Sequence, residues 1–191
     1  MSSTAVPKND VEEGWLWDKR EGILTRAELS TLYHRKLERV LSRTDRLIKL
    51  LSLIGGSAAI ARVATTDVIV AIGLTIAIAN GLGLVMAFAD RSRKHAELAS
   101  SFKLLEREIV AAGERDFTER DLNQWEASLR EIEAGEPPDL SALVRICQNE
   151  QALARGDLKH VYRIHWYERA FAFWFDFPAR KLEPAFPDEP K

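Results

Sequence analysis

Residues Val68–Ala89, VIVAIGLTIAIANGLGLVMAFA, decide the fold of this chain. The stretch holds 22 residues without a charged side chain, and a helix needs about 20 such residues to cross the hydrocarbon core of a bilayer. Its glycines would weaken a helix in water, but glycine is common in membrane helices. The alternative is a core helix of a soluble protein, but the rest of the 191-residue chain has too little apolar surface to enclose it. We therefore predict a transmembrane helix over residues 68–89.

A weaker apolar stretch, residues 47–66 (LIKLLSLIGGSAAIARVATT), precedes it. Its uninterrupted part, residues 50–61, has 12 residues, a length that by itself suits a re-entrant or buried segment. Lys49 and Arg62 lie near the ends, where long basic side chains can extend to the headgroups. The turn between the two stretches is very short, so they must run antiparallel. We predict that residues 47–66 and 68–89 form a two-span transmembrane hairpin.

Basic residues flank both ends of this hairpin and are scarce at its turn, where only Arg62 and Asp67 lie close by. Lysine and arginine remain on the cytosolic side of a membrane. The flanking basic residues are Arg35, Lys36, Arg39, Arg43, Arg46, Lys49, Arg91, Arg93 and Lys94. We therefore expect a multi-pass membrane protein with both termini in the cytoplasm.

Small and polar residues within the hairpin are candidates for helix packing or for a pore. Small residues four apart let membrane helices approach closely, either within one hairpin or between subunits. Asn80 is the only strongly polar side chain in the second stretch, and it either bonds the first helix or faces a pore or another subunit. The candidate residues are Ser52, Gly55, Gly56, Ser57, Thr75, Asn80, Gly81 and Gly83.

Outside the hairpin, helical spacing again dominates. Thr25 and Glu28 form a capping-box pattern, which predicts a cytosolic helix over residues 25–46 after a disordered or loosely ordered N-terminus, residues 1–24. On the other side of the hairpin, a helix is predicted over residues 90–112. Each helix carries a narrow apolar seam, so the two should pack together as a stalk.

The C-terminal region is predicted to hold shorter helices over residues 118–177. Thr118 and Asp121 form an N-terminal capping pattern, and the last helix is expected to cover residues 157–177. Residues 178–191 are rich in proline and acidic residues and are expected to be disordered. We predict an all-α fold: a two-span transmembrane hairpin with long helices that extend into a cytosolic helical bundle.

Aromatic residues are concentrated in residues 165–177, HWYERAFAFWFDF. Three environments remain open for them: the core beside the stalk, the membrane interface, where aromatic rings are favoured, or a contact with another subunit or a partner. The residues assigned to such an interface or partner contact are Trp166, Phe171, Phe173, Trp174 and Phe177.

The chain lacks the sequence motifs of common enzymes. It contains no glycine-rich phosphate loop, CxxC, HExxH or G-x-S-x-G pattern. Glu106 and Glu108 lie among arginines, the usual pattern of a solvated helix, and Cys147 is expected to be a buried structural thiol. The net charge of −2 argues against nucleic-acid binding. We expect no catalytic residue, no metal and no cofactor.

The order of the parts carries a family resemblance over roughly residues 30–175. A basic helix (YHRKLERVLSRTDRLIKLLS) enters a weak span, a strong span follows (DVIVAIGLTIAIANGLGLVMAFAD), and a helix comes directly after it (RSRKHAELASSFKLLEREI). This order resembles the SLATT proteins, two-transmembrane effectors associated with nucleotide second-messenger systems of bacterial conflict and anti-phage islands.

The resemblance implies a homo-oligomeric effector in the bacterial inner membrane. Such an effector forms or opens a pore when it is triggered by a partner, a sensor or signalling protein encoded nearby. The alternative is a non-conducting anchor or scaffold that recruits a soluble partner to the cytosolic face. In both cases the lipid bilayer is the first partner of the chain.

Overall fold

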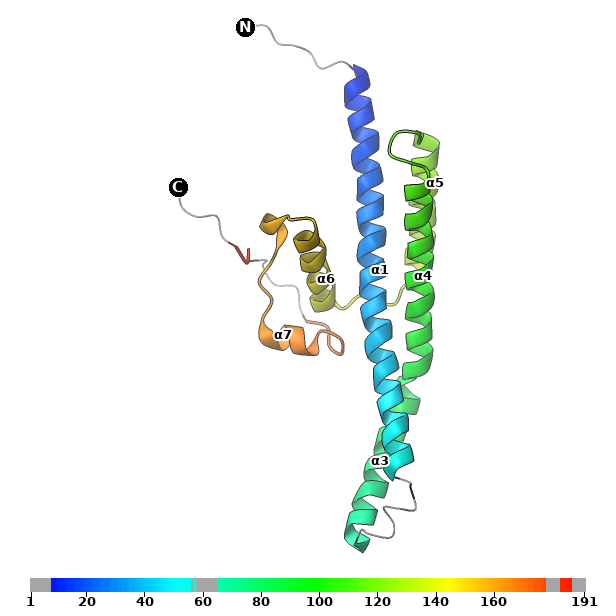
Figure 1. Cartoon of the computed structure of the whole chain (residues 1–191), viewed down its shortest axis with the longest axis vertical. Helices are drawn as coiled ribbons and strands as arrows, with labels where there is room; N and C mark the ends of the chain where they lie inside the picture. Colours follow the sequence, from blue (N-terminus) through cyan, green and yellow to red (C-terminus); the bar gives the residue numbers. More distant parts are fainter. Residues whose placement is uncertain (1–7, 56, 58–64, 178–182, 187–191) are drawn as a thin grey trace. The chain divides into compact units, whose positions relative to one another are not determined.

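The computed structural model describes residues 8–55, 57, 65–177 and 183–186. The elements are α1 (Lys8–Gly55), α3 (Thr66–Met86), α4 (Phe88–Ala111), α5 (Glu119–Ala134), α6 (Ser141–Ala154), the 3-10 turn η1 (Leu158–His160) and α7 (Trp166–Phe171) (Figure 1). Within the described ranges there is no β-strand, only an isolated bridge between Tyr162 and Pro184. The predicted all-α class is confirmed.

The chain divides into two compact units. Unit 1 comprises residues 1–34 and 98–191, and unit 2 comprises residues 35–97. α1 and α4 contribute residues to both units, α5 to α7 belong to unit 1, and α3 belongs to unit 2. The residues of the predicted hairpin therefore fall within unit 2.

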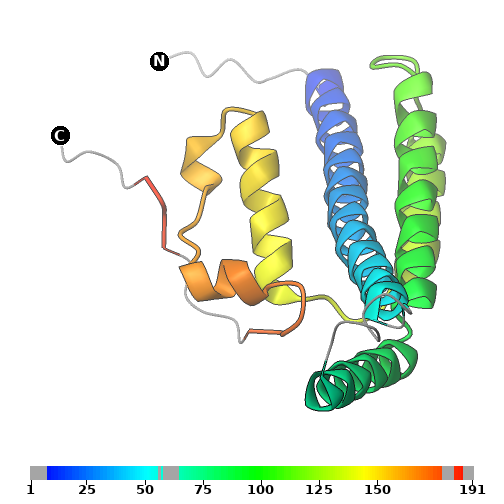
Figure 2. The same cartoon turned by 60° about the horizontal axis from the view of Figure 1, so that its bottom comes forward.

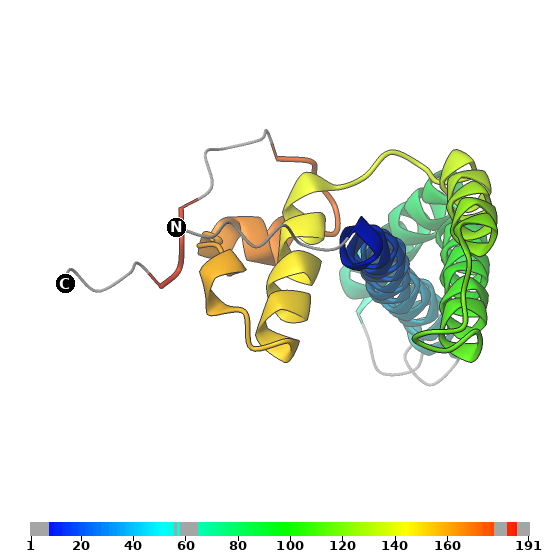
Figure 3. The ribbon, with the colours of Figure 1, turned by 90° about the horizontal axis from the view of Figure 1, so that it is seen from above.

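The core of unit 1 lies between α1, α4 and α5. Phe102, Leu105 and Ile109 occur at spacings of three and four residues, so they share one face of α4, and all three are buried. Residues of α1 and α5 complete the cluster, which consists of Ile23, Ala27, Phe102, Leu105, Ile109, Leu122, Trp125 and Leu129. Within unit 1, α6 and α7 lie on the opposite side of α1 from α4 and α5 (Figure 3).

The first helix begins earlier than its sequence pattern indicates. α1 starts at Lys8, so the predicted start at Thr25 is wrong, and residues 8–24 are helical. Thr25 and Glu28 do not cap a helix end. They bind the guanidinium of Arg155 in α6, with Nη1 at 2.8 Å from Thr25 Oγ1 and Nη2 at 2.7 Å from Glu28 Oε2. A tertiary contact thus uses the residues that resemble a local cap.

The helix boundaries after α4 follow local signals more closely. Thr118 caps α5 as predicted: its side chain accepts from the Asp121 N–H, and the Asp121 side chain accepts from the Thr118 N–H at 2.8 Å. Gly135 follows as the C-cap of α5. The long last helix predicted over residues 157–177 is wrong, because only η1 and the six-residue α7 form there.

The side chain of Asn149 explains why that last helix is interrupted. Its Nδ2 donates to the Tyr162 carbonyl at 2.6 Å, and its Oδ1 accepts from the Tyr162 N–H at 2.9 Å. The neighbouring N–H of Arg163 donates to the Glu183 carbonyl at 2.8 Å. These bonds hold Tyr162 in an extended segment, so the helix cannot begin before residue 166. They also give residues 183–186, expected to be disordered, a defined position; the rest of the predicted tail lies outside the described residues.

In unit 2, α3 lies antiparallel to the C-terminal part of α1 (Figures 1 and 2). Ser52 pairs with Asn80, and Ile48 lies against Gly83 farther back along α1. The C-terminal end of α1 and α3 therefore lie side by side within the region where the sequence predicts the hairpin. Residues 56 and 58–64, which belong to the predicted first span, residues 47–66, lie outside the described residues.

The helix predicted over residues 68–89 is broken near its end. α3 ends at Met86, and Ala87 adopts φ +46°, in the left-handed region that a side chain with a Cβ disfavours. The break redirects α4 so that Phe88, Ser92 and His95, spaced four and three apart, are buried. Ser92 Oγ then donates to the Glu38 carbonyl of α1 at 3.2 Å. The predicted single helix is wrong at this junction.

Candidate functional site

α3 is apolar and fully accessible at its surface. It has 21 residues and no buried side chain, and at a rise of 1.5 Å per residue it is about 31 Å long, the thickness of a hydrocarbon core. Leu84 and Val85 are more than 80% exposed, at 84% and 81%. In the part of the chain that the structure describes, one helix is long and apolar enough to cross a membrane, and it contains α3. A core helix of a soluble protein would instead be buried on most sides.

The end of α1 that faces α3 is also apolar at its surface. Leu53 is 74% exposed, although leucine is normally placed away from water. The same holds for its neighbours, and the exposed large apolar residues here are Leu47, Leu50, Leu51, Leu53 and Ile54. Together with α3 they form one apolar hairpin surface, larger than the patches that soluble monomers usually expose.

The polar side chains in the hairpin bond within it. Asn80 Nδ2 donates to Ser52 Oγ at 2.9 Å. The single hydroxyl proton of Ser52 has two acceptors in reach, Asn80 Oδ1 at 3.1 Å and the Ile48 carbonyl at 2.8 Å. Thr75 donates to the Ala71 carbonyl of its own helix at 2.8 Å. Of the two alternatives for Asn80, the geometry is that of a bond to the neighbouring helix.

The glycines assigned to packing divide into two groups. A Cβ on Gly55 would overlap the Ile76 side chain, and one on Gly83 would lie 3.5 Å from Ile48 Cδ1, so both glycines face the partner helix. A Cβ on Gly81 or Gly73 would meet nothing within 4 Å. Gly81 therefore faces away from the hairpin contact.

The two remaining hairpin candidates lie at the end of α1. Ser57 is half-buried, and its N–H donates to the Ile54 carbonyl at 3.1 Å. Gly56 lies outside the described residues.

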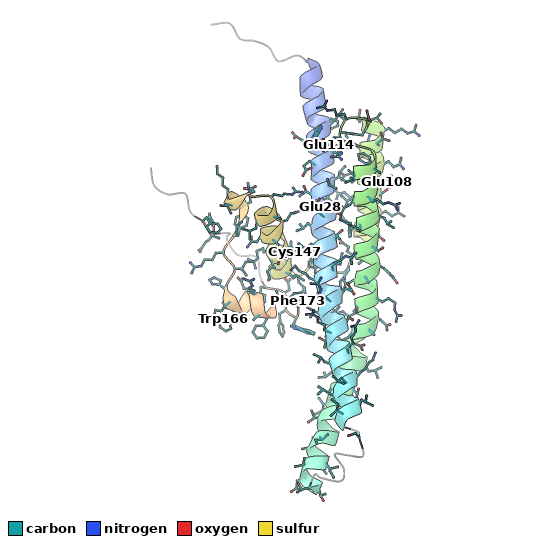
Figure 4. The ribbon with its side chains drawn as sticks, viewed as in Figure 1. Glu28, Glu108, Glu114, Cys147, Trp166 and Phe173 are labelled. Carbon is teal, nitrogen blue, oxygen red and sulfur yellow. The ribbon has the colours of Figure 1, made fainter. Side chains whose placement is uncertain are left out.

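The aromatic residues of α7 and the segment after it divide between exposed and half-buried positions. Trp166 is 78% exposed and points away from α6 (Figure 4). Phe171 and Trp174 are exposed as well, while Phe173 and Phe177 are half-buried. Phe175, which the sequence analysis did not assign, is 60% exposed. We call the exposed rings the aromatic surface; it consists of Trp166, Phe171, Trp174 and Phe175.

The opposite side of this segment anchors it to α6. Glu168 is buried and lies 3.3 Å from Arg145 of α6. Its other oxygen accepts from the His165 N–H at 3.0 Å, which caps α7. Asp176 accepts from the Ser141 N–H at the start of α6, and this bond lowers the pKa of its carboxyl group. The aromatic surface is thus held in place by polar contacts on its far side.

A buried polar cluster in unit 1 was missed by the sequence analysis. His34 is fully buried, with Nε2 at 2.6 Å from Glu136 Oε1, and its ring stacks on Phe102 at 5.8 Å. Glu106, expected to be solvated, is buried and accepts from the Thr31 hydroxyl at 2.5 Å. His34 and Glu136 are 102 residues apart, so no local spacing could have paired them.

Tyr33 lies beside this cluster. Burial raises the pKa of its phenol to about 12, against the opposing effect of the Leu140 N–H, which donates to its oxygen at 3.0 Å. Burial also raises the pKa of the Asp139 carboxyl group, and the negative charge of Glu136 adds to the effect. These groups link α1 to the start of α6, and their contacts suit a structural role.

A polar cleft of about 360 Å³ lies within unit 1, lined by Thr25, Gln148, Gln151, Ala152, Arg155, Asp157, His160 and Tyr162. Arg155 is paired with Glu28, and His160 with Asp157 at 2.6 Å. These charges are thus engaged within the chain, and we assign no ligand to the cleft. Across the described ranges, no three His, Cys, Asp or Glu side chains gather so that they could hold a metal ion.

Cys147 is buried on α6 (Figure 4), as the sequence analysis expects. Its burial inside the helical unit is typical of a structural thiol. The candidate sites of this chain are therefore two surfaces, the apolar hairpin and the aromatic surface. Comparison with protein-family models, with curated proteins and with solved structures finds no match for this chain.

Proposed function

We propose that this chain is an integral membrane protein whose hairpin, residues 47–66 with residues 68–89, crosses the bilayer twice and anchors a helical unit at the cytosolic face. The exposure of α3 carries the proposal: a 21-residue apolar helix without a buried side chain is stable against lipid and costly against water. The basic residues at both ends of the hairpin support cytosolic termini, and the SLATT resemblance implies the inner membrane of a bacterium.

Among functions for such a protein, the contacts favour an anchor or scaffold. A channel wall needs polar groups that face water. Among the described hairpin residues, Asn80 and Ser52 satisfy each other, and Thr75 bonds its own helix. The geometry of unit 1 suits this role as well, since it offers a rigid helical platform for a soluble partner. No step of catalysis is part of the proposal.

A second candidate is the pore-forming effector that the SLATT resemblance implies. The observation that favours it is the outward position of Gly73 and Gly81, where an added Cβ would meet nothing within 4 Å. Ala77, exposed between them at the same four-residue interval, extends this small-residue face. Such a face lets a second copy approach closely in lipid, and several copies are needed to enclose a channel.

One experiment tests membrane insertion, and measurements of ion flux and membrane potential then separate the two functions. Alkaline extraction of isolated membranes tests insertion, and the anchor and the effector both predict that the chain stays in the pellet. Ion flux is then measured in liposomes that contain the purified protein, and membrane potential is followed in cells that carry the neighbouring genes during phage challenge. The anchor predicts no flux and full polarisation; depolarisation that depends on this chain would favour the effector.

A further inference from the structure

We infer that the aromatic surface of unit 1 lies in the headgroup layer of the same membrane that the hairpin crosses. This inference rests on the proposed membrane insertion and adds a second, peripheral lipid contact. The surface presents two tryptophans and two phenylalanines to solvent in a segment of ten residues, 166–175. Tryptophan is enriched at membrane interfaces because its ring is apolar and its N–H remains hydrated.

The charges beside these rings fit an anionic lipid surface. Arg163 and Arg169, which lie in the same segment as the aromatic surface, are both exposed. The two acidic residues of the segment bind groups of unit 1. Glu168 is buried against Arg145, and Asp176 accepts a hydrogen bond from the Ser141 N–H. Among the exposed charges of residues 161–177, Arg163 and Arg169 therefore outnumber Asp176. Exposed basic residues near an anionic cytosolic leaflet strengthen membrane binding.

Contacts inside unit 1 place the aromatic surface near the last α1 residues of this unit. Asp176 binds the start of α6 at Ser141, and the preceding residue, Leu140, donates to Tyr33 of α1. The other end of α6 binds α1 much earlier, through Arg155 and Glu28. From His34, the last α1 residue of unit 1, the apolar stretch at Leu47 is 13 residues away (47 − 34), a length of about 20 Å in a helix.

Because this connection is short, we propose that the aromatic surface binds the bilayer rather than a protein. If the hairpin is inserted, the membrane is always present within a short length of chain, at an effective concentration that no free partner reaches. The rings and the basic residues then add to binding without a second molecule. A partner protein or a second copy is the alternative that the experiment must exclude.

The test uses the full chain, with Cys147 replaced by alanine, reconstituted in vesicles of phosphatidylethanolamine and phosphatidylglycerol. A fluorescent label is attached at Trp166→Cys, and quenching by lipids with a nitroxide at the headgroup is measured. Ala127→Cys, an exposed position on α5, is the matched control. We expect quenching several-fold stronger at residue 166 than at residue 127, and weaker quenching at 166 when phosphatidylglycerol is replaced by phosphatidylcholine.

Two results would overturn the inference. Equal, weak quenching at both positions would show that lipid does not contact the aromatic surface. A label at residue 166 that is shielded from water but not quenched by lipid would assign this surface to a protein contact. Arg163→Gln with Arg169→Gln should reduce quenching at 166 and leave 127 unchanged. Resistance to alkaline extraction, measured on the same samples, reports hairpin insertion separately, so failure of this inference is distinct from failure of the proposed anchor.

Discussion

At the scale of single residues, one amide and one hydroxyl make the polar contact between α1 and α3, the helices proposed to lie in the membrane. Asn80 and Ser52 lie on different helices and approach to 2.9 Å. In hydrocarbon neither group has water as an alternative partner, yet such bonds contribute only about 0.6–2 kcal/mol each, because the separated helices also find partners. The pair is therefore expected to fix the register of the hairpin more than its total stability.

A double-mutant cycle tests this pair. We expect Asn80→Leu and Ser52→Ala each to destabilise the hairpin in detergent, with a coupling free energy of about 1 kcal/mol between them. Thr75→Val is the control, since the Thr75 hydroxyl bonds only its own helix among the contacts observed, and its coupling to Asn80→Leu should be near zero. Additive effects of Asn80→Leu and Ser52→Ala would contradict the geometry.

Tyr33 gives a second test, through pH. Its folded-state pKa is raised to about 12 from an ordinary value of 10.0, so between these values the unfolded chain has lost a proton that the folded chain keeps. The stabilisation that comes from the raised pKa of Tyr33 is complete below pH 10.0. As the pH rises further, the free energy of unfolding falls by at most about 1.4 kcal/mol per pH unit. Tyr33→Phe removes this dependence. The difference in unfolding free energy between wild type and variant should narrow above pH 10.0; a constant difference would refute the assignment.

At the scale of elements, the signals that predicted structure correctly are local ones. The uncharged run that became α3 and the Thr118 cap of α5 depend on residues close together in the chain. The errors arise where distant residues intervene. Asn149 fixes the backbone at Tyr162 and interrupts the predicted last helix, and Arg155 binds the Thr25 and Glu28 side chains that resemble a cap. The buried pair of His34 and Glu136 has the same origin.

The contacts between α1 and α3 predict that leucine at Gly55 and leucine at Gly81 differ in their effect on the stability of the hairpin. Gly55→Leu should destabilise the hairpin in detergent, because Ile76 and Ile72 occupy the space that the new side chain needs. Gly81→Leu should leave the folding of one chain unchanged, since its position is open. Ile76→Ala should partly rescue Gly55→Leu. Equal destabilisation by the two leucines would show that α3 packs on α1 through another face.

Gly81→Leu also reports on association between copies. If the outward small-residue face joins subunits, the leucine separates them and lowers the mass of the detergent-solubilised complex. An unchanged mass, in a wild type that is itself monomeric, would leave only the anchor. A lower mass of the Gly81→Leu complex would report association alone, because a side chain at Gly81 meets nothing within the hairpin that the leucine could disturb.

At the scale of the whole molecule, the proposed anchor combines a hairpin in lipid with a helical unit in the cytosol. The all-α class and the long apolar helix were predictable from the sequence, because apolar length and helical spacing are properties of the chain itself. The aromatic surface was predictable as a concentration of rings, but not which rings are exposed, since that depends on Glu168 and Asp176 holding the other side against α6.

The central claim is that the chain crosses the membrane twice with both ends in the cytosol. Single cysteines are placed at Thr65 and Ser100, both exposed positions, in a Cys147→Ala background, and whole cells are treated with a membrane-impermeant thiol reagent. We expect Thr65→Cys to be labelled on intact cells and Ser100→Cys only after the membrane is permeabilised. Labelling of Ser100→Cys from outside, or recovery of the chain in the soluble fraction, would contradict the claim.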